Sequence, residues 1–121
     1  MATKDEALQY LRSKFPGTES KPEFFSIELD LDEGRSHKVF VGMVDAFVIM
    51  KAPFAVVQNV NAMRALEASN IFGVSLVGDA FCLTHLLPLA DLDESEILVG
   101  IGLLCNVADK LEASLMGGDR F

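Results

Sequence analysis

The fold is decided by the stretch HKVFVGMVDAFVIMK, residues 37–51, because its pattern requires a sheet with two apolar faces. A strand from about His37 to Met43 carries apolar side chains at both parities, and side chains of a strand alternate between two faces. One face holds Val39, Val41 and Met43, and the other holds Phe40 and Val44. Strands with two apolar faces are covered on both sides. The stretch therefore predicts a strand whose two faces are both covered by other elements.

A second strand from Ala46 to about Lys51 repeats the pattern, with Phe47 and Ile49 opposed by Val48 and Met50. We assign Phe40, Val48 and Met50 to the face that the chain's own helices leave open. An exposed apolar surface of several hundred Å² is typical of an interface. We therefore predict a homodimer, or a groove that binds an apolar segment of another polypeptide.

Methionines extend this hypothesis, because their flexible side chains suit adaptable peptide-binding surfaces. Met63 falls in the next predicted helix, and core filling is the simpler interpretation of any single methionine. The candidate residues for a partner or dimer interface are Phe40, Val48, Met50 and Met63.

Around these strands the spacing predicts three helices and three further strands. The first helix has Leu8, Leu11 and Phe15 on one face, and Pro53 leads into a helix over residues 54–69. The stretch between the first helix and Pro22 is read as a loop. The other predicted strands cover residues 25–31, 72–77 and 80–87. The order helix-β-β-β-helix-β-β-helix predicts a single α+β domain over residues 1–121, an antiparallel sheet with helices packed on it.

The last helix has the strongest pattern, with apolar residues stepping by four and three from Ile97 to Leu115. Asp93 and Glu96 fit a capping box at its start. Gly100 and Gly102 each cost about 1 kcal/mol of helix propensity, and we expect them to mark a close approach to a neighbouring backbone.

Composition excludes several functional classes. The 121 residues include 10 Lys and Arg against 18 Asp and Glu, a formal net charge of −8. This charge argues against binding to nucleic acids or to anionic membranes, because a protein that binds either needs clustered positive charges. The polar N-terminus has no signal-peptide pattern, and Cys82 and Cys105 make no disulfide framework, so we expect a cytoplasmic protein.

Residues that carry chemistry are sparse. His37 follows a turn and is expected to be exposed, and a zinc site from Cys82, His85 and Cys105 would lack paired ligand spacing. We therefore predict no catalytic, cofactor-binding or metal-binding residues and no enzyme activity. The alternative is a small-molecule-binding or enzymatic domain with a pocket between sheet and helices, using His85 and a carboxylate such as Asp79.

The chain resembles the YbjN family of bacterial proteins, within the wider group with the type III secretion chaperone-like fold. The resemblance lies in the strand end LLPLADLD, residues 86–93, and in the long helix of residues 96–115, which contains NVADKL. The region of residues 47–70, which ends in MRALEASN, also fits.

The resemblance implies an α+β sandwich that is commonly dimeric. Secretion chaperones of this shape are acidic cytoplasmic proteins that bury apolar side chains of an extended effector segment. YbjN proteins are described as regulators of sensory transduction. The resemblance supplies no catalytic residue, so the expected function is a non-enzymatic protein-binding module or a sensory-transduction regulator.

Overall fold

The computed structural model describes residues 3–15, 19–21, 24–31, 34–69, 72–117 and 121. It confirms the α+β class, with an antiparallel sheet and helices packed on it. The elements in chain order are α1 (Lys4–Lys14), β1 (Glu19–Lys21), β2 (Phe24–Asp30), β3 (Ser36–Val44), β4 (Phe47–Val56), α2 (Ala62–Ala68), β5 (Gly73–Val77), β6 (Ala80–Pro88) and α3 (Glu94–Met116).

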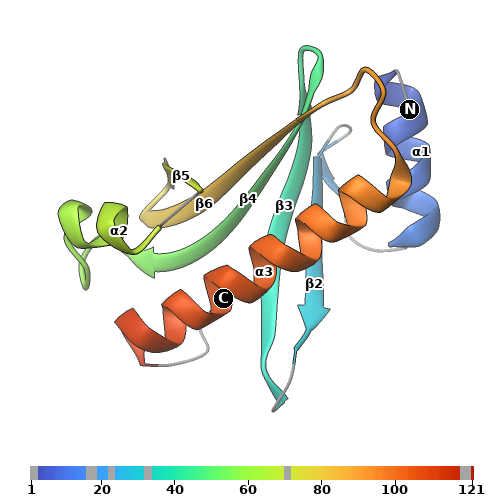
Figure 1. The fold of residues 1–121 in the computed structure, drawn as a ribbon. Coiled ribbons are helices and arrows are strands. Elements are labelled where there is room, and N and C mark those ends of the chain that lie inside the picture. Colours follow the sequence, from blue (N-terminus) through green and yellow to red (C-terminus); the bar gives the residue numbers. More distant parts are fainter. Residues whose placement is uncertain (1–2, 16–18, 22–23, 32–33, 70–71, 118–120) are drawn as a thin grey trace.

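The sheet has the strand order β1-β2-β3-β4-β6-β5, with every neighbouring pair antiparallel. The five predicted strands are present, and the short β1 is an additional strand within the predicted loop before Pro22. Figure 1 shows α3 crossing one face of the sheet, where it contacts β3, β4 and β6. Helix α1 lies beside the start of α3, and α2 lies at the opposite end of the sheet (Figure 1).

The register fixes which side chains share a face, because residues directly opposite each other on paired strands project to the same side. Val41 pairs with Met50, and Met50 pairs with His85. The face that α3 covers therefore holds Val39, Val41 and Met43 of β3 together with Val48 and Met50 of β4. Side chains from α1 and α3 complete one continuous core there.

Helix α3 is long and well defined at both ends. Asp93 and Glu96 form the predicted capping box, in which each side chain accepts a hydrogen bond from the other residue's backbone N–H. Gly117 ends the helix with φ 74°, a left-handed conformation that favours glycine. In the described part of the chain, no helix has the length and apolar character needed to cross a membrane.

Gly100 brings α3 close to β4. A Cβ atom at Gly100 would lie 3.2 Å from Met50 Sδ and 3.3 Å from Met50 Cε, whereas a Cβ at Gly102 would meet no atom within 4 Å. The expected close approach is therefore correct for Gly100 only, and its neighbour is a side chain rather than a backbone.

The predicted helix over residues 54–69 is wrong in its first half. β4 continues to Val56, and the helix is only Ala62–Ala68. The β4–β6 register shifts between Pro53 and Ala55, and such an irregularity accommodates a proline that has no N–H to donate. Burial also favours the strand, since every residue from Ala52 to Val56 is buried.

Candidate functional site

Among the described residues, no helix covers one face of the sheet, and part of that face is exposed. The rows Gly42–Ile49–Leu86 and Val44–Phe47–Pro88 run across β3, β4 and β6 on the side away from α3. Val44, Phe47 and Leu86 are 51%, 42% and 52% exposed, while Phe40 and Ile49 are half-buried. We call this surface the outer face; its apolar residues are Phe40, Val44, Phe47, Ile49 and Leu86.

A hollow of about 220 Å³ continues the outer face where β3 and β4 separate. Phe40 and Pro53 line it from these strands, Cys82 lines it from β6, and Phe121 also lines it. Ligand pockets for small molecules usually measure about 300–1,000 Å³. The hollow therefore suits one or two apolar side chains better than a cofactor.

Charges surround the outer face. By register, Glu28 and Asp30 of β2 and Lys38 and Lys51 of the central strands project to this same side. The whole chain carries a net charge of −8. The four charges on the outer face balance each other, so it is the net negative charge of the whole chain that would attract a partner with basic residues.

Two of the four predicted interface residues are not on a surface. Val48 and Met50 are both 0% exposed, so the prediction that they are open to solvent is wrong. The error came from placing Val48 and Met50 on the same face as Phe40. Met50 lies opposite Val41 and Phe40 lies opposite Lys51, so Met50 and Phe40 project to opposite sides of the sheet. Phe40 is half-buried on the outer face, and Met63 on α2 is 66% exposed.

The residues of the alternative hypothesis do not come together. Asp79 is in the turn before β6, and His85 lies six residues further along that strand, a separation of about 20 Å at 3.3 Å per residue. His85 projects towards α3 and makes an edge contact with the Phe72 ring, whose centroid is 5.9 Å away.

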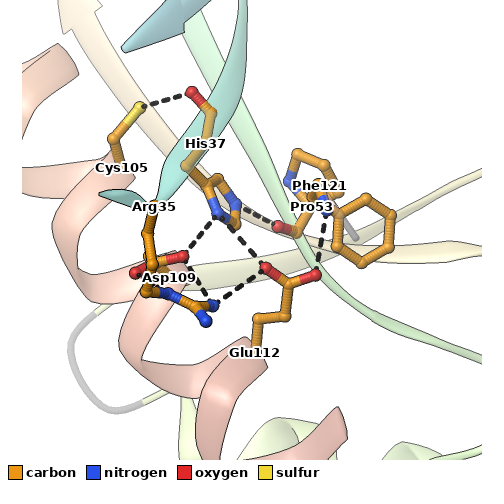
Figure 2. A network of polar contacts seen from close by, with 7 residues as sticks. All are labelled: Arg35, His37, Pro53, Cys105, Asp109, Glu112 and Phe121. Carbon is orange, nitrogen blue, oxygen red and sulfur yellow. Dashed lines mark hydrogen bonds and ion pairs between the residues drawn. The ribbon is translucent and has the colours of Figure 1, made fainter. Parts of the chain in front are cut away.

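A second cluster joins the first half of β3 to the last half of α3 (Figure 2). His37 is fully buried, which contradicts the expectation that it is exposed. Its side chain shares the covered face with Val39 and Val41, and Asp109 and Glu112 approach it from α3. Arg35 completes the set. We call Arg35, His37, Asp109 and Glu112 the polar cluster.

Hydrogen bonds orient most atoms of the polar cluster. Arg35 Nε donates to Asp109 Oδ2 at 2.9 Å, and Arg35 Nη2 donates to Asp109 Oδ1 at 3.0 Å. His37 Nε2 lies 2.6 Å from the Pro53 carbonyl oxygen, and Glu112 Oε2 accepts from the Phe121 N–H at 2.9 Å. The hydrogen bonds from the Arg35 guanidinium lower the pKa of the Asp109 carboxyl despite its burial.

The two cysteines are buried and free. Burial raises the pKa of the Cys82 thiol to about 11 and that of the Cys105 thiol to about 12, with the Asp109 charge adding to the rise at Cys105. Because the thiolate is the reactive form, both residues are poor nucleophiles and poor metal ligands at neutral pH.

Sequence reasoning missed the polar cluster, although the sequence held a signal for it. Asp109 and Glu112 continue the buried stripe of Ile101 and Cys105 at spacings of four and three. His37 has the same parity as Val39 and Val41. Acidic residues in the apolar stripe of a helix need a polar or charged partner, and a histidine on the buried face of a strand is a candidate for that partner.

No protein-family model matches the chain, and no curated protein matches it. Among solved structures it is similar to a chain in the crystal structure of the ExsC–ExsE complex, with a TM-score of 0.70 and 15% sequence identity. The match covers 95% of this chain and 97% of the other chain. The fold is therefore type III secretion chaperone-like.

Proposed function

We propose that this chain, which has a type III secretion chaperone-like fold, is a non-catalytic module that binds an apolar segment of a partner polypeptide on its outer face. The observation that carries the proposal is the uncovered row of apolar side chains across β3, β4 and β6. An apolar surface of this kind is typical of an interaction site.

Three further features support a polypeptide over a small molecule. The hollow beside Pro53 is small and apolar, so it suits an anchoring side chain. His85 lies about 20 Å from Asp79 along β6 at 3.3 Å per residue, and both thiols stay protonated. The solved structure with the similar fold is itself a complex, that of ExsC with ExsE.

The finer proposal is a YbjN-like role in a bacterial cytoplasm, in which binding of the partner regulates it. The resemblance of residues 86–93 and 96–115 to that family supports this role. The two free, buried cysteines are consistent with a reducing compartment.

Peptide binding tests the docking surface. The probe is a fluorescent 15-residue peptide with apolar residues at alternate positions and lysines at both ends, and the readout is fluorescence anisotropy. We expect the wild-type chain to bind it, and Ile49→Asp or Leu86→Asp to weaken binding at least tenfold, because each places a charge in the apolar row.

The matched control is Val99→Asp, which changes a 66% exposed valine of α3 away from the outer face. It should leave peptide affinity unchanged, and circular dichroism should show that all three variants are folded. Equal affinity of the wild-type chain and Ile49→Asp would contradict the proposed surface, as would no binding of the peptide by the wild-type chain.

A further inference from the structure

The two ring nitrogens of His37 have different surroundings. Nε2 lies 2.6 Å from the Pro53 carbonyl oxygen, which can only accept, so Nε2 carries a proton. Nδ1 has no hydrogen-bond partner and faces carboxylate oxygens of Asp109 and Glu112. The residue is 0% exposed, so water does not reach Nδ1 from the surface.

Two cations can neutralise the carboxylates beside His37, a proton on Nδ1 or a shared metal ion, and the distances around Nδ1 distinguish between them. Nδ1 lies 3.5 Å from Asp109 Oδ1 and 3.6 Å from Glu112 Oε1. A proton on Nδ1 would draw an oxygen to about 2.7–3.2 Å. A tetrahedral metal ion with bonds of about 2.1 Å would instead separate its ligand atoms by about 3.4 Å. The two distances from Nδ1 to the carboxylate oxygens fit ligands of one shared metal ion.

The hydrogen bond at Nε2 agrees with metal ligation at Nδ1. Histidines that bind a metal through one nitrogen usually donate the other N–H to a carbonyl or carboxylate, which fixes the ring and the tautomer. The Pro53 carbonyl has this role here, and it lies in the irregular part of β4.

We propose that His37 Nδ1, Asp109 Oδ1 and Glu112 Oε1 form a binding site for one divalent transition-metal ion of the zinc class. The three atoms lie within 4.8 Å of one another and come from two elements far apart in sequence. Imidazole nitrogen and carboxylate oxygen are ligands that zinc accepts. The ion would fasten the last half of α3 to the first half of β3, a role beyond the docking of a partner on the outer face.

Arg35 competes with the ion for the same oxygens. Its Nη2 lies 3.0 Å from Asp109 Oδ1 and 3.6 Å from Glu112 Oε1, and its Nε bonds the other oxygen of Asp109. The Arg35 side chain is 25% exposed, so it marks the side from which an ion would enter. Removing this positive charge should therefore increase the affinity of the site for the metal ion.

The experiment uses the full chain after treatment with a chelator, titrated with Zn²⁺ by calorimetry and with Co²⁺ by absorption spectroscopy. We expect one ion per chain and tetrahedral cobalt bands without a thiolate charge-transfer band. His37→Gln should weaken zinc binding at least tenfold, and Arg35→Gln should tighten it severalfold. A merely structural salt bridge would not produce these opposite changes.

His85→Gln is the matched control, since it removes the other histidine and should leave the zinc affinity unchanged. If His37→Gln does not fold, the zinc affinity of Arg35→Gln and the cobalt spectrum of the wild-type chain still test the proposal. No zinc binding by the folded wild-type chain would overturn the proposal. A thiolate band, or equal affinity of wild type and His37→Gln, would also overturn it.

Discussion

Adjacent residues of β4 have opposite environments. Met50 is fully buried beneath Gly100 of α3, whereas Ile49 lies half-buried on the outer face. The alternation follows from strand geometry, but the side that the helices cover does not. A substitution at each position therefore tests a different property of the chain.

Met50→Asp should destabilise the chain by more than about 4 kcal/mol, because it buries an unpaired charge in the core. Ile49→Asp should change the free energy of unfolding by about 1 kcal/mol or less. Urea denaturation measures both values. A folded Met50→Asp chain of near wild-type stability would contradict the register that pairs Met50 with Val41 on the covered face.

The long helix depends on its contact with the sheet as well as on its own propensity. The capping box and the left-handed Gly117 set its ends, and its apolar stripe packs on β3, β4 and β6. Two glycines interrupt it, one over Met50 and one in open space. Because their surroundings differ, substitutions at the two glycines distinguish the effect of helix propensity on stability from the effect of packing against the sheet.

Gly102→Ala should stabilise the chain by about 0.5–1 kcal/mol, since alanine has the higher helix propensity and its Cβ meets nothing. Gly100→Ala should gain less, because the Met50 side chain has to move by a few tenths of an ångström. Thermal or urea unfolding of the two variants gives the comparison. A larger gain at position 100 than at position 102 would contradict the described packing.

At the scale of the whole molecule, a second apolar region lies at the end of the sheet opposite α1. Met63 and Leu66 on α2 are 66% and 55% exposed, and Leu76 on the edge strand β5 is 59% exposed. An edge strand presents unpaired backbone groups that can join another chain. We propose this end as the contact of a homodimer, which leaves the outer face for the polypeptide partner.

Light scattering during gel filtration tests the dimer. The wild-type chain should have twice the chain mass of 13.2 kDa, and Met63→Asp combined with Leu76→Asp should return it to the mass of one chain. Phe40→Asp, on the outer face, should keep the mass of the dimer. A single-chain mass for the wild-type protein at high micromolar concentration would contradict the proposal.

The sequence by itself determined the elements whose signals are local. Alternation over residues 25–51 and the capping box at the start of the last helix depend on neighbours in the chain, so they could be predicted. The α+β class followed from the order of these elements. Tertiary structure alone decided the strand register, which pairs Met50 with Val41, and the irregularity at Pro53 that extends β4. It also decided the meeting of His37 with Asp109 and Glu112, because these contacts join residues more than 70 positions apart that only packing brings together.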